Sequence, residues 1–121
     1  MNELQVETRH VGDVAVLYPK GYINAHTARA FESEIRSALR QERFKLVVNA
    51  VGLQYIASAG LGAMMGAIEE IREHGGDLRL CGLSESVLHI FEILGFHHLY
   101  RIFPSEAEAV ASFRADGRED S

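Results

Sequence analysis

The sequence predicts one α/β domain in which a mixed β-sheet is flanked by helices. Residues 46–48, Leu-Val-Val, form a β-favouring apolar run that is typical of a strand covered on both faces. Strand-like and helix-like segments alternate along the chain, and helices are the crossovers that parallel strands need. The 121 residues and 47% hydrophobic composition match one domain with its own core.

The chain begins with a predicted β-hairpin. Residues 4–9 and 14–20 are strand-like and close enough to pair across a short turn. Pro19 and Gly21 are expected to end the second strand, because both residues interrupt regular strands.

A helix is predicted next. Its apolar positions keep helical spacing: Ala28, Phe31, Ile35 and Ala38. Asn24 or Thr27 can cap its start. Glu32 and Arg36 stand four residues apart, so they are expected to form a modest ion pair on its outer side.

Residues 46–48 are expected to lie mid-sheet, and a second helix follows them. Its apolar residues share one side of a helix and should pack on the sheet: Leu61, Met64, Met65, Ile68 and Ile71. Ser58 lies one turn before Leu61 and is predicted to be the N-cap. Gly75 and Gly76 mark the C-terminal end.

Residues 77–81 form a short predicted strand that ends in Cys81. This single cysteine has no partner for an internal disulfide and is expected to be a small buried side chain in a reducing compartment. Ser84 is predicted to cap a third helix, which Gly95 stops.

The chain ends with a weaker strand at residues 100–103 and a helix that begins after Ser105, with Glu108 at capping-box spacing. The predicted order is ββαβαβαβα. The single domain is expected to span residues 3–114, and residues 115–121 are expected to be a disordered tail.

The second helix has an unusual flank. At about 100° per residue, Ser58, Gly62 and Gly66 share a stripe, with Ala59 and Ala63 beside it. Each glycine inside a helix costs about 1 kcal/mol relative to alanine, so the pair indicates either close packing within the fold or a smooth surface for a partner. A phosphate on Ser58 would be tolerated, because a helix start favours negative charge.

Composition argues against several function classes. The net charge of −5 comes without a basic cluster, which argues against nucleic-acid binding. No segment approaches the roughly 20 apolar residues that span a bilayer, and the start lacks an apolar signal core. The sequence therefore predicts a cytoplasmic protein without direct membrane insertion.

Three alternative sites are weaker. Ser58 could be a hydrolase nucleophile, but Ile56 replaces the first glycine of Gly-x-Ser-x-Gly. The glycines from Gly60 onward do not directly follow a strand, as a dinucleotide fingerprint requires. Adjacent His97 and His98 would point in different directions, which disfavours a metal site. No catalytic residue, cofactor or metal is predicted.

Two segments carry a family resemblance: residues 21–27, Gly-Tyr-Ile-Asn-Ala-His-Thr, and residues 55–62, Tyr-Ile-Ala-Ser-Ala-Gly-Leu-Gly. With the element order, they resemble the STAS domain of bacterial anti-sigma-factor antagonists over residues 3–114. The resemblance implies a STAS-like fold and a non-enzymatic module that binds an anti-sigma factor. In that family the binding partner is also a serine kinase, and a phosphatase reverses its action.

Carried over by position, the resemblance makes Ser58 the phosphoacceptor and implies a monomer or weak dimer. It also implies a docking surface: Asn24, Ala25, His26, Thr27, Ala57, Ser58, Ala59, Gly62, Ala63 and Gly66. Asp is common in the family at the positions of Asn24 and Ala57. The second function class is therefore a STAS-type subunit of a signalling scaffold or lipid-transport complex, in which Ser58 is not modified.

Overall fold

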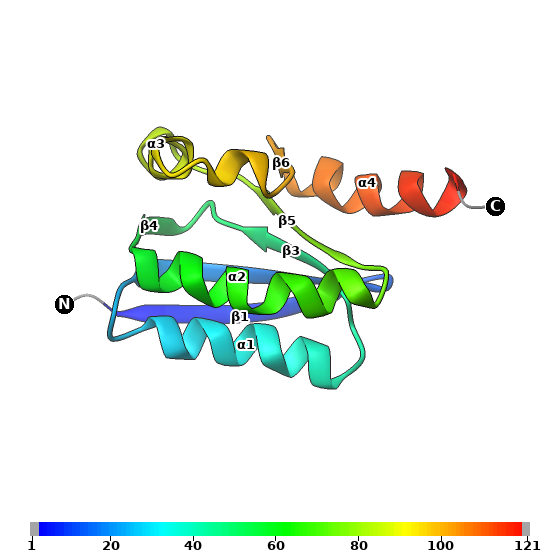
Figure 1. The fold of residues 1–121 in the computed structure, drawn as a ribbon, viewed down its shortest axis with the longest axis horizontal. Helices are drawn as coiled ribbons and strands as arrows, with labels where there is room; N and C mark the ends of the chain where they lie inside the picture. The colour runs from blue at the N-terminus through cyan, green and yellow to red at the C-terminus, as the bar shows by residue number, and fades with distance from the viewer. Residues whose placement is uncertain (1–2, 120–121) are drawn as a thin grey trace.

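The computed structural model describes residues 3–119 and confirms the α/β fold class, with a six-stranded sheet and helices on both of its faces (Figure 1). The strands are β1 Leu4–Val11, β2 Val14–Ile23, β3 Lys45–Asn49, β4 Leu53–Ile56, β5 Asp77–Cys81 and β6 Ile102–Phe103. The helices are α1 Ala28–Arg40, α2 Ser58–Glu73, α3 Glu85–Ile93, the short 3₁₀ helix η1 Phe96–His98, and α4 Glu106–Glu119. The predicted order holds, with β4 and η1 as additional elements.

The sheet has the order β1-β2-β3-β5-β6, and β4 pairs with the far end of β2. Only β1 is antiparallel to its neighbour; the other pairings are parallel. The carboxyl ends of β2 to β6 therefore meet at one edge of the sheet, which is where ligands of open α/β sheets bind.

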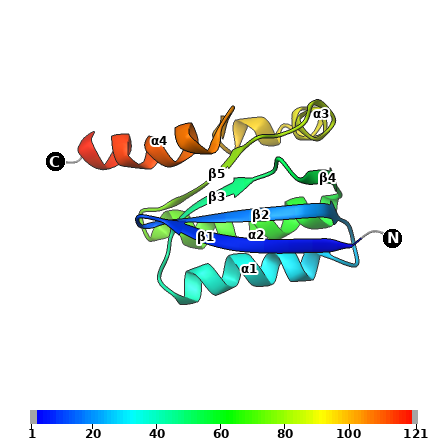
Figure 2. The same cartoon turned by 180° about the vertical axis from the view of Figure 1, so that it is seen from behind.

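Two layers of helices cover the sheet. Leu46 and Val48 of β3 point into a core with α1, α2 and α3, whereas Val47 points into a smaller core with α4. Seen from behind, strands β1 and β2 of the sheet lie in front of α2 (Figure 2). Since β3 is covered on both faces, its three central residues can all be apolar.

The predicted end of β2 needs correction, and β4 is a strand that was not predicted. Strand β2 does not end at Pro19 and Gly21 but continues to Ile23, through an irregularity between Gly21 and Tyr22. Gly21 makes this possible with a φ of +111°, and a Cβ there would lie 2.2 Å from the carbonyl oxygen of Glu3. The extension of β2 then pairs with β4, which is too short to show a clear period.

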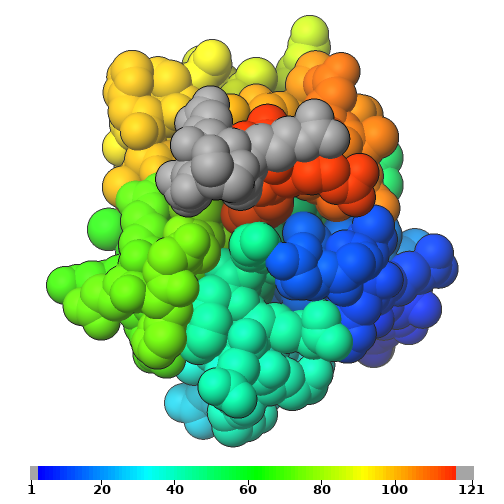
Figure 3. Space-filling model, turned by 90° about the vertical axis from the view of Figure 1, so that its right-hand side faces the viewer, coloured from blue at the N-terminus to red at the C-terminus, as the bar shows by residue number. Residues whose placement is uncertain are grey.

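The last helix is longer than predicted. Helix α4 continues to Glu119, past residue 115, where the tail was expected to begin; residues 120 and 121 lie outside the described part of the chain. Within its last turns, Asp116 accepts a hydrogen bond from Arg79 of β5. Figure 3 shows α4 in red at this end of the molecule, above residues 41–45. In residues 3–119, no helix combines the length and the hydropathy that a membrane crossing requires.

Candidate functional site

The pairing of β2 with β4 builds the candidate site. Ile23 and Ile56 are partners in the parallel register, so the loop after β2 and the start of α2 leave the sheet side by side. The N–H of Ala57 donates to the carbonyl of Ile23 at 2.8 Å and fixes the two segments together. This tie places residues 24–27 next to Ser58.

Two side chains hold the loop of residues 24–27 in shape. The Oδ1 of Asn24 accepts hydrogen bonds from the N–H groups of His26 at 2.9 Å and Thr27 at 3.2 Å. Thr27 occupies the N-cap position of α1, but its hydroxyl turns back and donates to the carbonyl of Tyr22 at 2.7 Å. Thr27 therefore does not cap α1 with its side chain, whereas Asn24 caps the turn of residues 25–27 that leads into α1. Together the two residues order a loop that exposes Ala25 and His26.

Ser58 is not the N-cap of α2, contrary to the prediction. Ala57 occupies that position in an extended conformation, with φ −93° and ψ 170°, and has no side-chain oxygen to accept from the first N–H groups. Ser58 is the first helical residue and is exposed. The hydroxyl is therefore accessible at the positive end of a 16-residue helix, whose first N–H groups lack carbonyl partners.

The glycine flank of α2 faces outward. Gly62 and Gly66 are exposed; a Cβ on Gly62 would meet nothing within 4 Å, and one on Gly66 would meet only the guanidinium of Arg36 at 4.0 Å. Close packing within the fold therefore does not explain these glycines. Ala59 is also exposed, whereas Ala63 is only 7% exposed, because it lies on the sheet-facing side of the helix.

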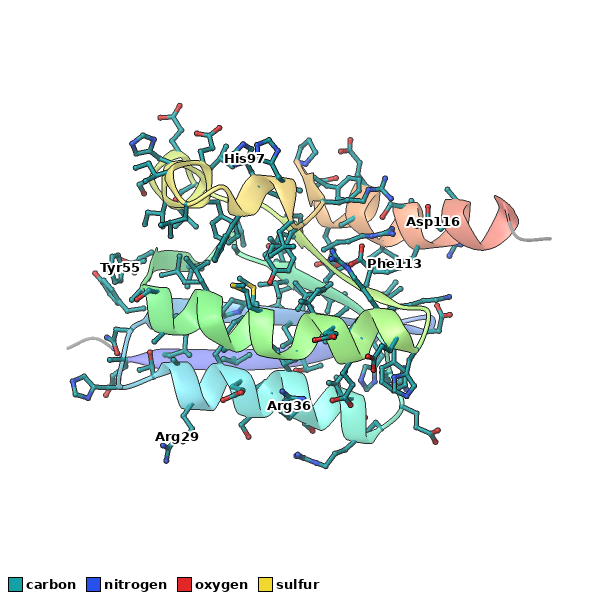
Figure 4. All side chains as sticks on the ribbon, in the orientation of Figure 1. Arg29, Arg36, Tyr55, His97, Phe113 and Asp116 are labelled. Atoms are coloured by element: carbon teal, nitrogen blue, oxygen red, sulfur yellow. The ribbon has the colours of Figure 1, made fainter. Side chains whose placement is uncertain are left out.

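Arg36 connects α1 to this flank. Its guanidinium donates to the carboxylate of Glu70 at 3.1 Å and to the carbonyl of Gly66 at 3.0 Å. Figure 4 labels Arg36 between the two helices. The predicted partner Glu32 is on the same helix, but α2, which runs parallel to α1, supplies a carboxylate and a carbonyl together (Figure 1).

Strand β4 adds an aromatic residue that sequence analysis did not select. Tyr55 is 44% exposed and lies at the end of the sheet where α2 begins (Figure 4). Its partner in β2 is Tyr22, whose hydroxyl donates to Gln54 at 3.2 Å. The strand that carries Tyr55 was not predicted, and Gln54 beside it is exposed as well.

The buried side of α2 agrees with its predicted apolar face except at one position. Leu61, Met64, Ile68 and Ile71 are buried, whereas Met65 is 45% exposed. Gly60 is also buried, and a Cβ there would lie 2.4 Å from Cγ2 of Ile23 and 2.9 Å from Cγ1 of Ile56. Gly60 therefore lets the helix start sit directly on the strand pair that positions the site.

A matched pair of glycine variants tests this arrangement. Gly60→Ala is expected to lower the free energy of unfolding by about 1–3 kcal/mol, because the added methyl group overpacks the core. Gly62→Ala is expected to raise it by about 1 kcal/mol, because the methyl group enters open space and favours the helix. Urea unfolding of both variants provides the measurement. Equal effects would contradict the buried and exposed assignments.

Cys81, His97 and His98 lie away from this site. Cys81 is fully buried, as predicted, and burial raises the pKa of its thiol to about 11. The rings of His97 and His98 lie 3.9 Å apart in η1. Among the described residues, no three His, Cys, Asp or Glu side chains are grouped as metal ligands.

These features define a class: an α/β domain that presents an exposed serine at a helix start beside a rigid loop. The family model of the STAS domain matches residues 5–109. The chain therefore belongs to the STAS-domain family.

Two relatives of the chain are described as anti-sigma factor antagonists. The chain is 30% identical over 95 residues to BtrV of Bordetella bronchiseptica, described as an anti-sigma factor antagonist, covering 78% of this chain and 82% of BtrV. It is 24% identical over 108 residues to the anti-sigma F factor antagonist of Paenibacillus polymyxa, covering 88% and 92%.

A solved structure agrees with the fold. Unphosphorylated SpoIIAA, also an anti-sigma factor antagonist, superposes with a TM-score of 0.79 at 21% identity, over 92% of this chain and 97% of SpoIIAA. SpoIIAA has been solved in a phosphorylated form as well. At this identity, the likeness establishes the fold alone.

Proposed function

We propose that this protein is an anti-sigma factor antagonist, a binding module that sequesters an anti-sigma factor with serine kinase activity. Phosphorylation of Ser58 switches it off, and a phosphatase restores it in the cytoplasm. The observation that carries the proposal is the exposed hydroxyl of Ser58 at the first helical residue, beside the ordered loop of residues 24–27. The names of the relatives support the same role.

The proposed docking surface combines that loop, the start of α2 and its glycine flank. It consists of Asn24, Ala25, His26, Thr27, Tyr55, Ala57, Ser58, Ala59, Gly62 and Gly66. Ala63 is left out because it is buried. Without side chains at Gly62 and Gly66, a partner helix or loop can approach the backbone of α2 closely. Tyr55 supplies an aromatic side chain, a residue type enriched at interfaces.

A phosphate on Ser58 would act locally. It adds about −1.5 to −2 charge and three acceptor oxygens, and the free N–H groups at the start of α2 are suited to receive them. The domain therefore stays folded when it is modified. Within an interface, however, the phosphate needs desolvation and repels any acidic partner group, which costs several kcal/mol. Binding is lost without refolding.

The modification can be tested by intact-mass measurement after expression in the native host, with peptide mapping and Ser58→Ala as the control. One added phosphate, absent in the variant, is expected. A pull-down is expected to recover a small ATP-binding kinase. Persistent absence of phosphate during growth and stress would contradict the switch.

A second function rests on Asn24 and Ala57, which place no carboxylate beside Ser58. In that case the chain is a STAS-type subunit of a signalling scaffold or lipid-transport complex, with an unmodified Ser58. The same pull-down would then recover scaffold or transporter components instead of a kinase.

A further inference from the structure

A polar depression lies on the surface near the last turn of α2, far along this helix from Ser58. It is formed by the last turn of α2, the start of β5, and the segment from η1 to β6, and it has a volume of ≈ 790 Å³. Its polar lining comes from Arg72, Asp77, His97, His98, Tyr100 and Arg101. Figure 4 labels His97 above the middle of α2. None of these residues belongs to the proposed docking surface.

The lining carries excess positive charge. Arg72 donates to Asp77 at 3.0 Å and to the carbonyl of Leu99 at 2.7 Å. Arg101 is 52% exposed, and its nearest carboxylate is Asp116 at 3.6 Å. Arg79 pairs with the same two aspartates, so three arginines share two carboxylates. The guanidinium of Arg101 is therefore only weakly engaged.

Two buried polar atoms of the lining residues have no partner. Tyr100 is 2% exposed, and neither its hydroxyl nor Nδ1 of His97 has a hydrogen-bond partner among the described residues. Burial raises the pKa of Tyr100 to about 12, and the charges of Arg72 and Asp77 act on that pKa in opposite directions. Both of these residues line the depression together with Tyr100. Buried polar groups are nearly always paired, so these two atoms are candidates to bind a ligand in the depression.

We propose that this depression binds a phosphate monoester. Arg101 and Arg72 present guanidinium forks that match phosphate oxygens, and the Tyr100 hydroxyl donates to the same group. Because the Tyr100 hydroxyl is buried, this contact requires neighbouring side chains to move when the ligand binds. Ile102 and Phe103 also line the depression and offer an apolar surface to the organic part of the ligand. The volume suits a small organic molecule better than a bare ion.

NMR titration of the full chain tests the site, with phenyl phosphate and inorganic phosphate as probes at constant ionic strength. Saturable shifts at residues 97–103 are expected, with phenyl phosphate binding roughly tenfold more tightly than inorganic phosphate. Arg101→Ala is expected to weaken binding about tenfold, because a charge-assisted pair is lost. Tyr100→Phe, which keeps the ring in the core, is also expected to weaken it.

Arg29→Ala provides the control, since Arg29 is an exposed arginine at the other end of the molecule (Figure 4). The affinity of the Arg29→Ala variant for phenyl phosphate should equal that of the wild type. Three results would overturn the proposal: shifts that rise without saturation, shifts centred on Ser58, or Arg101→Ala and Tyr100→Phe variants that bind as the wild type does.

Discussion

Replacing Ser58 with Glu is expected to weaken binding to the anti-sigma factor at least about a hundredfold, which corresponds to about 2.7 kcal/mol. Ser58 is exposed at the centre of the proposed docking surface, between the loop of residues 24–27 and Gly62. A carboxylate there must be desolvated and opposes acidic partner groups, and like charges across an interface cost several kcal/mol. Titration calorimetry with the purified partner measures the effect.

Two variants separate this effect from a loss of fold. Ser33→Glu introduces the same charge on an exposed serine of α1 outside the docking surface, so its affinity should stay close to that of the wild type. Ser58→Ala should bind but accept no phosphate. The free energies of unfolding should stay within about 0.5 kcal/mol of the wild type, as for most surface substitutions. A Ser58→Glu variant with wild-type affinity would refute the electrostatic switch.

Arg79→Ala is expected to cause the largest loss of stability, about 3 kcal/mol, with a fall in Tm of roughly 10 °C. The Arg79 side chain is 6% exposed on the α4 face of β5. It donates to Asp77 at 3.0 Å, to Ser112 at 2.7 Å and to Asp116. Its guanidinium also lies 4.1 Å from the ring centre of Phe113, which points from α4 toward the sheet (Figure 4). The substitution removes these interactions together and leaves a cavity under α4.

Arg79→Met should lose about half as much stability as Arg79→Ala. Methionine keeps the apolar stem of the side chain, and Asp77 retains Arg72 as a partner. Arg114→Ala, at an exposed position on α4, should change stability little. Thermal unfolding of the three variants gives the comparison. If Arg79→Ala melted at the wild-type temperature, β5 would not hold α4 through this side chain.

The same network predicts a pH effect. The hydrogen bond from Arg79 lowers the pKa of Asp116 below its usual value, so this carboxylate stabilises the fold above its unfolded pKa of about 3.9. That contribution is lost as the pH falls through the lowered pKa of the folded state. Stability should therefore fall less steeply in Arg79→Met than in the wild type below about pH 4. Parallel slopes in acid unfolding would show that Asp116 does not depend on Arg79.

Local patterns were enough for several elements. The hairpin, the strand at residues 46–48 and the cap of α3 were predicted because their signals lie within a few residues of each other. Ser84 accepts a hydrogen bond from the N–H of Val87 at 3.2 Å, and Gly75 adopts a φ of +79° after α2, as their residue types require. The family resemblance also selected Ser58 and residues 24–27 from short motifs.

The geometry of the site depended on contacts between distant segments. Strand β4 exists because β2 continues past Gly21, and that pairing sets residues 24–27 beside Ser58. Only the packed structure showed that a Cβ on Gly62 would meet open space, whereas a Cβ on Gly60 would clash with the side chain of Ile23.

The amino-acid sequence by itself determined the element order, the fold class and the candidate serine, because periodicity and turn residues act over a few positions. The tertiary structure decided that Ala57 rather than Ser58 is the N-cap, that Arg36 reaches α2, and that Arg79 is buried under α4. These outcomes depend on which strands become neighbours and on which partner each charged side chain then meets. Such pairings are set by the packing of the whole domain, and no window of the sequence contains both partners.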